Sequence, residues 1–362
     1  MGKKLHILFL PENIASMPAL TASSLNKNEN VIAKCLSRTV HKYQQKNETL
    51  IFLPEIPSKN YLFKWILAKW KYRRVLKKWI CWADILHYTF TTGLPNGQDL
   101  KWAKKLNKPI VIEWMGSDIR NPDLLKKINP YYKKAFENGY EYARVESCEQ
   151  SQKNQKLFAK NNAVPVFFPE MKLFIDSSLF KNSYLIFQRI NLNSFIPHYP
   201  SLENKRPMIV HSPSAKIAKG TNVLLPVIES LKKDFEFEFI LLHDLPREKV
   251  LETLKNADIF IDQLILGNYG MASIEAMSFG KPVMCYIMPE VFECGLPQEC
   301  PIVNANPDNL KKQLIRLITD ARFRNETGKM SRAFVEKYHD VEKISKQLLS
   351  IYKSINEKKV ND

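Results

Sequence analysis

The sequence predicts an α/β protein built from two doubly wound, Rossmann-like domains. The chain has 362 residues, which is enough for about two domains of ordinary size. Short, continuous apolar segments recur along it, as is typical of strands buried on both faces of a parallel sheet. Helical patterns lie between these segments in each half of the chain. Alternation of strands and helices predicts doubly wound domains.

Ten strands are expected, five in each half of the chain. They cover residues 5–10, 50–53, 84–88, 109–114, 164–168, 208–211, 237–242, 258–262, 282–287 and 301–303. Helices are expected at 61–80, 220–234, 246–256, 271–279, 307–321 and 341–357. Residues 168–207 lack this alternation of strands and helices and contain four prolines, so we interpret them as the interdomain connection plus an entry strand. The cleft between two such domains is the expected binding site.

Composition excludes several classes of protein. The 45% apolar content excludes a disordered chain. The longest apolar runs fall far short of the roughly 20 residues that cross a bilayer. The six cysteines and seven histidines are scattered without metal-ligand spacing, so no metal site is expected. Scattered thiols in a chain of this length fit a reducing cytoplasm.

The net charge of +17 is concentrated in the first half of the chain. Residues 1–180 hold 29 Lys and Arg against 15 Asp and Glu, whereas residues 181–362 hold 25 against 22. Residues 61–80 contain seven basic residues, three tryptophans and no acidic residue. Basic faces with interleaved tryptophan suit an anionic membrane surface, and ordinary solvated charge is the alternative. A nucleic-acid partner is not expected, because no zinc finger, RNP sequence or helix-turn-helix pattern occurs.

The loop that follows the strand at 208–211 has the composition of an anion site. It contains Ser214, Lys216, Lys219 and Gly220, and a helix follows it. Backbone amides and a helix amino terminus favour phosphate, and a lysine adds a mobile cation. A solvated loop lysine is the alternative interpretation.

A second loop, after the buried strand at 258–262, carries Gly267 and Gly270 and leads into a helix from Met271. Glycines let a ligand approach the backbone, and the free amides of the first helical turn point at it. Glu275 lies just past that turn. Its carboxylate could accept two hydroxyls of a ribose, or it could complement the helix dipole.

These pieces resemble the C-terminal domain of retaining GT-B glycosyltransferases, specifically glycosyltransferase family 4. The resemblance lies in the loop at 213–221, in residues 257–258, in residues 269–283, and in the spacing of roughly 56 residues from Lys219 to Glu275. Residues 83–87 and 114–120 resemble family segments of the first domain more loosely. The GT-B fold then implies an acceptor-side domain at 1–190, a donor domain at 191–340, and a helix at 341–362 that packs back on the first domain.

The resemblance implies a retaining glycosyltransferase that needs no metal cofactor. The co-substrate would be a nucleotide-diphosphate sugar, foremost a UDP-sugar. The acceptor would be a membrane-associated glycan, such as a lipid-linked O-antigen or capsule intermediate. Lys219 would act catalytically on the leaving diphosphate, Glu275 would hold the ribose, and His243 would lie by the base. The donor-binding residues expected are Ser214, Lys216, Lys219, Gly220, His243, Tyr269, Gly270, Met271, Ala272 and Glu275.

Three positions depart from the family pattern. The first glutamate of its Glu-x7-Glu motif would fall at Gly267, and the cleft histidine would fall at Met115. Position 213 is proline where an arginine is common, and Lys216 is its expected substitute. Asp118 and Arg120 are expected on the acceptor side, with Asp118 catalytic. A non-catalytic nucleotide-sugar-binding or partner subunit is the alternative function. The expected location is the cytoplasm, peripheral to the inner face of the plasma membrane.

Overall fold

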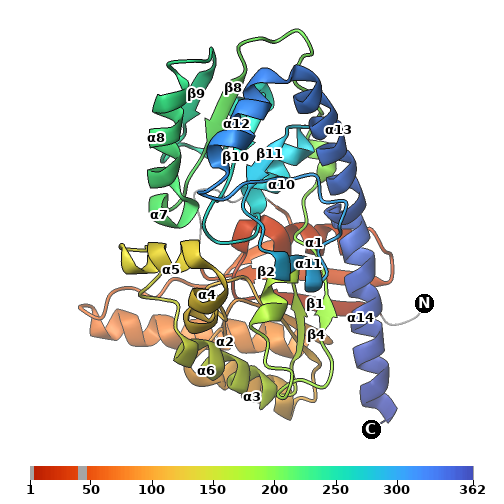
Figure 1. Cartoon of the computed structure of the whole chain (residues 1–362). Coiled ribbons are helices and arrows are strands. Elements are labelled where there is room, and N and C mark those ends of the chain that lie inside the picture. Colours follow the sequence, from red (N-terminus) through yellow and green to blue (C-terminus); the bar gives the residue numbers. More distant parts are fainter. Residues whose placement is uncertain (1–3, 40–46, 362) are drawn as a thin grey trace. The chain divides into compact units, whose positions relative to one another are not determined.

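The computed structural model describes residues 4–39 and 47–361 and divides into two compact units. Unit 1 comprises Met1–Arg120, Glu149–Arg189 and Val341–Asp362, and unit 2 comprises Asn121–Cys148 and Ile190–Asp340. Residues 121–148 therefore cluster with the second unit, although the sequence interpretation assigned them to the first domain. Figure 1 shows the elements of both units.

Unit 1 contains a seven-stranded parallel sheet in the order β3-β2-β1-β4-β5-β6-β7. Its strands are β1 (Leu5–Leu10), β2 (Val31–Ser37), β3 (Leu50–Phe52), β4 (Ile85–Thr89), β5 (Ile110–Glu113), β6 (Val164–Phe167) and β7 (Tyr184–Leu185). The order 3-2-1-4-5-6 is that of a doubly wound nucleotide-binding sheet. Strand β2 was not predicted from the sequence because Lys34 interrupts its apolar run, although Val31, Ala33 and Cys35 alternate as buried residues.

Helices surround this sheet, and the last helix of the chain is one of them. They are α1 (Met17–Leu25), α2 (Leu62–Trp82), α3 (Gln98–Lys105), α6 (Cys148–Ala159) and α14 (Val341–Asn361), with short 3-10 turns η1 (Ile14–Ser16), η2 (Pro95–Gly97) and η3 (Pro169–Leu173). Helix α14 packs against α1. The hydroxyl of its Tyr352 also lies 2.5 Å from Nδ1 of His87 on β4, inside the unit.

Unit 2 contains a five-stranded parallel sheet in the order β12-β11-β10-β8-β9. Its strands are β8 (Met208–His211), β9 (Glu238–Leu241), β10 (Ile259–Ile261), β11 (Val283–Cys285) and β12 (Val303–Asn304). With β8 taken as the first strand, the order reads 2-1-3-4-5 and reverses between β8 and β10. In such sheets ligands bind beyond the carboxyl ends of the strands at this switch point.

The helices of unit 2 include several that were not predicted from the sequence, and the longest of these begins at Ala321. They are α4 (Pro122–Ile128), α5 (Pro130–Glu137), α7 (Lys216–Lys219), α8 (Thr221–Leu231), α9 (Arg247–Asn256), α10 (Met271–Ser278), α11 (Pro289–Glu293), α12 (Leu310–Thr319) and α13 (Ala321–Tyr338), with the 3-10 turn η4 (Leu192–Ser194). Asp320 ends α12 and caps α13 by accepting a hydrogen bond from the Phe323 amide. The buried face of α13 includes Thr327, Gly328 and Ser331, which give no apolar period.

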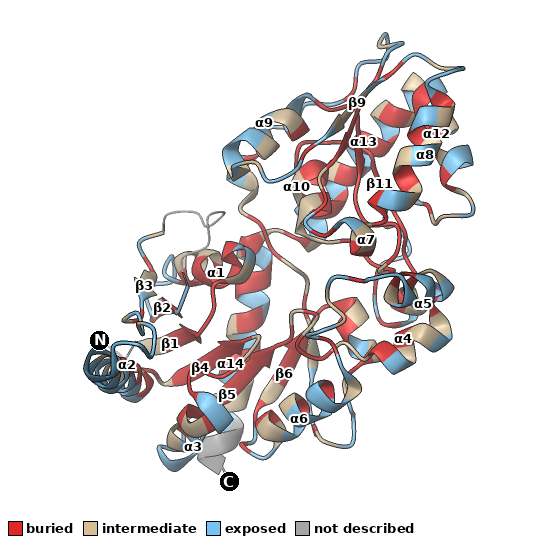
Figure 2. Cartoon of the chain, turned by 90° about the vertical axis from the view of Figure 1, so that its left-hand side faces the viewer, coloured by how far each residue is buried: buried red, intermediate tan, exposed pale blue. Residues whose placement is uncertain are grey.

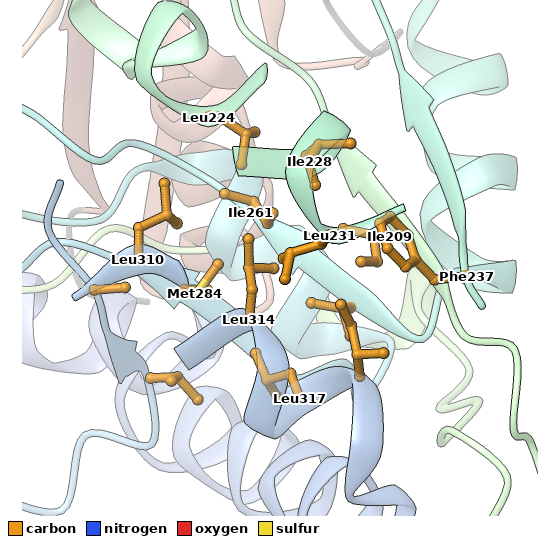
Figure 3. Close-up of a cluster of buried hydrophobic side chains, with 14 of the residues drawn as sticks. Ile209, Leu224, Ile228, Leu231, Phe237, Ile261, Met284, Leu310, Leu314 and Leu317 are labelled. Carbon is orange, nitrogen blue, oxygen red and sulfur yellow. The ribbon is translucent and has the colours of Figure 1, made fainter. Parts of the chain in front are cut away.

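An apolar core holds the switch point of unit 2 in place. Helices α8 and α12 bury leucines and isoleucines at helical spacing against the strands (Figure 3); examples are Leu224, Ile228, Leu231, Leu310, Leu314 and Leu317. Ile209 of β8 and Ile261 of β10 lie in the same cluster and are fully buried. Each such side chain contributes about 1.5–3 kcal/mol of transfer free energy. Strands β8, β10 and β11 are buried apart from Met208 at the start of β8 (Figure 2), so the loops at their carboxyl ends start from fixed points. The edge strand β9 is partly exposed.

Candidate functional site

Two loops meet at the switch point of unit 2, one after β8 and one after β10. Lys219 comes from the first loop and Asp262 directly follows β10. The Lys219 Nζ atom lies 2.7 Å from Asp262 Oδ1 and 2.9 Å from Gln263 Oε1. The structure therefore places the predicted lysine at the edge of the sheet where ligands of this topology bind.

Burial and charge together fix the ionisation of this pair. Burial alone would lower the pKa of the Lys219 ammonium, but the charge and hydrogen bond of Asp262 outweigh it and raise the pKa. Burial would raise the pKa of the Asp262 carboxyl, but Lys219, Ser273 and Gly270 hold it below its usual value. Both groups are charged at neutral pH, and the lysine keeps some exposure while the aspartate is almost fully buried.

The same carboxylate also binds the amino end of α10. Asp262 Oδ2 accepts hydrogen bonds from the Gly270 amide at 3.1 Å and from the Ser273 hydroxyl at 2.6 Å. A Cβ atom placed on Gly270 would stand 3.8 Å from Lys219 Nζ. The lysine ammonium therefore lies beside a helix amino terminus, where the helix dipole also favours an anion.

The predicted amide donors Met271 and Ala272 form the first turn of α10, and both are only partly buried. Amides of a first turn have no partner within the helix. Their position and exposure allow them to donate to an anion that sits at Lys219.

Glu275 lies one turn further along α10 and is paired with an arginine that the sequence analysis did not select. Its Oε1 atom lies 2.5 Å from Nη2 of Arg247, the first residue of α9. Burial raises the pKa of Glu275, and Arg247 opposes this shift. Arg247 stands at the amino terminus of α9, where the helix dipole disfavours a cation. The ion pair with Glu275 compensates this cost and explains why an arginine lies there.

The loop between β8 and α8 is shaped by Gly220 and His211. Gly220 ends α7 with φ +78°, and a Cβ atom there would lie 3.0 Å from Cβ of Leu264. His211 Nδ1 lies 2.9 Å from the carbonyl of Ile261, and its Nε2 lies 2.9 Å from the Thr221 hydroxyl. A carbonyl only accepts, so Nδ1 carries the proton. Burial lowers the pKa of His211 to about 4.

The outer part of this loop does not offer free backbone amides to a phosphate. Ser214 and Lys216 are exposed. The amides of Ile217 and Ala218 donate to the carboxylate of Glu141 at 2.7 and 2.9 Å. An acidic side chain of the protein therefore already occupies the amide end of α7, which leaves α10 as the amide donor beside Lys219.

Two residues of the predicted donor set have their side chains elsewhere. The buried Tyr269 hydroxyl lies 3.0 Å from Nε2 of His339, so only its backbone borders the loop before α10. His243 follows β9 and is exposed. The structure gives neither side chain a contact with Lys219 or Glu275 among the interactions of the described residues.

Gly267 is the position at which the family pattern would have a glutamate. Its φ is +87°, and a Cβ atom on it would lie 2.4 Å from Cγ of Met288. Its carbonyl accepts a hydrogen bond from the Met288 amide at 2.9 Å. Backbone conformation and packing therefore both require glycine here, and a glutamate would not fit without rearrangement.

The residues predicted for the acceptor side, Asp118 and Arg120, lie in unit 1, in the loop after β5. The Asp118 carboxylate accepts hydrogen bonds from the amides of Met115 and Gly116, at 3.0 and 2.7 Å. Burial raises the pKa of Asp118 to about 7, against these hydrogen bonds. Arg120 Nη2 lies 3.6 Å from Oε1 of Glu170. Asp118 thus closes its own loop and holds Met115 at the carboxyl edge of the sheet.

Across residues 4–39 and 47–361, no group of three or more His, Cys, Asp or Glu could hold a metal ion. In the same part of the chain, no helix combines the length and the apolar character needed to cross a bilayer.

The chain is similar to known proteins in part of its sequence and in its fold. A profile of the family described as glycosyl transferases group 1 matches residues 229–334, a stretch that contains Arg247, Asp262 and Glu275. No curated protein sequence matches the chain.

Solved structures show the fold. Sucrose-phosphate synthase from Thermosynechococcus elongatus superposes with a TM-score of 0.66 at 13% identity, covering 97% of this chain and 99% of that one. A glycosyltransferase from Rickettsia africae gives 0.63 at 15%, covering 98% and 99%. HepE from Anabaena, in complex with UDP and glucose, gives 0.53 at 12%, covering 97% and 100%. The two Rossmann-like sheets are those of the GT-B fold, which confirms the predicted fold class.

Proposed function

We propose that this protein is a retaining glycosyltransferase, similar to family 4, that uses a nucleotide-diphosphate sugar. One observation carries the proposal: Asp262 brings the Lys219 ammonium and the amino end of α10 together at the switch point of unit 2. A cation beside a helix amino terminus fits a diphosphate. HepE, which shares the fold, is known in complex with UDP and glucose, and this supports a UDP-sugar as the donor.

The chemistry assigned to this site is stabilisation of the leaving group. As the bond to the sugar breaks, negative charge develops on the diphosphate. Lys219 and the first-turn amides at Gly270, Met271 and Ala272 would meet that charge with donors that are already in place. Asp262 keeps the lysine ionised and aimed. Because these groups supply the positive potential, we propose transfer without a metal cofactor.

The rest of the donor would be held around these groups. Glu275 would accept the two ribose hydroxyls, with Arg247 orienting its carboxylate. His243, on the loop after β9, would lie by the base. Ser214, Lys216 and Gly220 would border the phosphates from the other loop, and Tyr269 would contribute through its backbone.

The acceptor is proposed to be a membrane-associated glycan, such as a lipid-linked O-antigen or capsule intermediate. Asp118, as a catalytic residue, and Arg120 would serve the acceptor side. The positive charge of residues 1–180 supports work at the inner face of the plasma membrane, in the cytoplasm, without a nucleic-acid partner. The free thiols of all six cysteines agree with that location.

A second candidate is a non-catalytic subunit that binds a nucleotide sugar or stabilises an active partner. Gly267 favours it, because the site lacks the carboxylate that the family pattern would have there and its geometry excludes one.

A donor panel followed by a transfer assay separates the two candidates. Thermal shifts with UDP-, GDP-, CMP- and dTDP-sugars identify the base, since a ligand that binds the folded state raises apparent stability. The selected donor is then incubated with lipid-linked and water-soluble glycan acceptors, with Glu275→Gln as the inactive control. Transfer with retained anomeric configuration supports the enzyme. Binding without transfer to any acceptor supports the non-catalytic subunit. Binding of no nucleotide sugar contradicts the enzyme and the nucleotide-sugar-binding subunit.

A further inference from the structure

Among the described residues, helix α2 carries more exposed large apolar side chains than any other element. Phe63 is 75% exposed, Leu62 64% and Trp70 58%, and Ile66 and Leu67 are each about half exposed. Contiguous exposed apolar side chains on a folded protein mark a surface that binds something. The unit 1 fold therefore leaves the first half of α2 without a covering element among the described residues.

Helical geometry separates the two faces of α2. Tyr72, Leu76 and Ile80 are its buried residues, and they repeat every four positions on one side. At 100° per residue, Phe63, Leu67 and Trp70 fall on the opposite side. The second half of α2 thus anchors the helix to unit 1, and the first half presents its apolar side chains away from the unit. Figure 2 shows α2 at a border of unit 1, where it packs against α3 and β1.

The exposed face changes from apolar to cationic along the helix. Arg74 and Lys78 continue the line of Phe63, Leu67 and Trp70, Lys71 flanks it, and all three basic residues are exposed. From residue 56 to residue 83 the chain contains eight basic residues and no acidic one.

Basic groups also lie over the aromatic rings of α2. Lys69 Nζ lies 3.8 Å from the Trp65 ring centre, and the Arg74 guanidinium lies 5.2 Å from that of Trp70. Apolar and cationic groups are therefore presented together on this helix.

We propose that α2 docks on an anionic lipid surface. Phe63, Leu67 and Trp70 enter the boundary between headgroups and acyl chains, and Lys71, Arg74 and Lys78 contact lipid phosphates. An amphipathic helix with aromatic and basic residues binds in this way. This names the partner surface of the membrane-associated enzyme proposed above, and it rests on that proposal only for the location of the acceptor.

Charge favours lipid over a second copy of this chain. Two copies that paired through α2 would bring two sets of eight cations together without a carboxylate between residues 56 and 83 to compensate them, and like charges across an interface are costly. An anionic membrane accepts both the apolar side chains and the cations.

The test is co-sedimentation of the full chain with phosphatidylglycerol vesicles and with phosphatidylcholine vesicles. The apolar variant is Phe63→Ser/Leu67→Ser/Trp70→Ser, and the charge variant is Lys71→Gln/Arg74→Gln/Lys78→Gln. Matched controls remove equally exposed side chains elsewhere: Ile196→Ser/Leu202→Ser/Met330→Ser for apolar area, and Lys101→Gln/Lys105→Gln/Lys153→Gln for charge.

Wild type and both control variants should co-sediment with phosphatidylglycerol vesicles and should not co-sediment with phosphatidylcholine vesicles. Each cation near an anionic surface contributes about 1 kcal/mol, so the charge variant should lose on the order of a hundredfold in partitioning. The apolar variant should lose at least about tenfold. Equal binding to both lipids, wild-type binding by both variants, or a dimer that the apolar variant dissociates would overturn the proposal.

A second readout separates this inference from the proposed function. Nucleotide-sugar thermal shift and transfer to a water-soluble acceptor should be unchanged in both α2 variants, because the donor residues lie in unit 2. Loss of lipid binding with unchanged donor binding supports α2 docking. If wild type binds lipid through α2 but binds no nucleotide sugar, the docking stands and the proposed function fails.

Discussion

The Nζ atom of Lys219 lies 2.7 Å from Oδ1 of Asp262, and the other oxygen of that carboxylate binds the Gly270 amide and the Ser273 hydroxyl. A single buried side chain therefore joins the lysine loop to the amino end of α10. An anion that arrives between them meets positive groups that need no reorganisation, which is the condition for strong electrostatic stabilisation.

Removal of Lys219 should affect both stability and activity, and a second substitution separates the two effects. Lys219→Met leaves the Asp262 carboxylate buried without its cation, so the free energy of unfolding should fall by about 3 kcal/mol. This is the lower end of the range for a broken buried ion pair, because the Lys219 side chain keeps some exposure. The double variant Lys219→Met/Asp262→Asn should recover most of that loss in a urea titration while transfer stays absent. Recovered transfer in the double variant would contradict the role of Lys219.

Arg247 should act on nucleotide binding through Glu275. Arg247→Ala removes the charged partner that orients the carboxylate, and a hydrogen bond to a charged group contributes about 1.5–3 kcal/mol. The affinity for UDP should fall roughly tenfold or more in calorimetry, with partial rescue by Arg247→Lys.

The control ligand is 2′,3′-dideoxy-UDP, a nucleotide that lacks both ribose hydroxyls. Its affinity should change little in Arg247→Ala, because Glu275 has no hydroxyl pair to hold. Equal losses for both nucleotides would assign Arg247 to another part of the ligand.

Gly267→Ala should destabilise unit 2. The residue has φ +87°, which costs a side-chain-bearing residue about 1–2 kcal/mol. The new Cβ atom would also overlap Met288, and overpacking adds about 1–3 kcal/mol. Gly267→Ala/Met288→Ala should relieve only the overlap. A wild-type melting temperature for Gly267→Ala would show that the position tolerates a side chain.

The buried His211 should make stability depend on pH in acid. Its pKa is about 4 in the folded protein against 6.5 ordinarily, so the unfolded chain binds a proton that the folded one does not. Stability should therefore fall as the pH drops from 6.5 to 4, by roughly 3 kcal/mol in total.

His211→Gln is the reference for this measurement. The stability difference between wild type and this variant, measured in urea at several pH values, should shrink across that window. A difference that stays constant with pH would show that His211 titrates normally.

Sequence patterns predicted the sheets because strands buried on both faces are continuous apolar runs. All ten expected strands overlap observed ones. The pattern failed at β2, where the partly exposed Lys34 interrupts the apolar run between buried residues. It also failed at α13, where the polar Thr327 and Ser331 fill buried positions.

The candidate site was predictable only in part. Lys219 and Gly270 border loops whose composition favours anions, and Glu275 lies just past the first turn of α10, where a carboxylate can accept hydroxyls. Asp262 carried a signal that could have been used, since it is polar and directly follows a buried strand. A cation at the start of a helix was a weaker signal for Arg247. Glu141 gave no signal, because its partner amides lie 76 and 77 residues away in the chain.

Calorimetry of UDP and uridine, or the matching pair for the base that the donor panel selects, tests the phosphate site most directly. Wild type should bind the diphosphate far more tightly than the nucleoside. In Lys219→Met/Asp262→Asn that preference should collapse while nucleoside affinity stays the same, and in Glu275→Gln both affinities should fall together. An unchanged preference for the diphosphate in the double variant would contradict the assignment of Lys219 and the amino end of α10 as the diphosphate site.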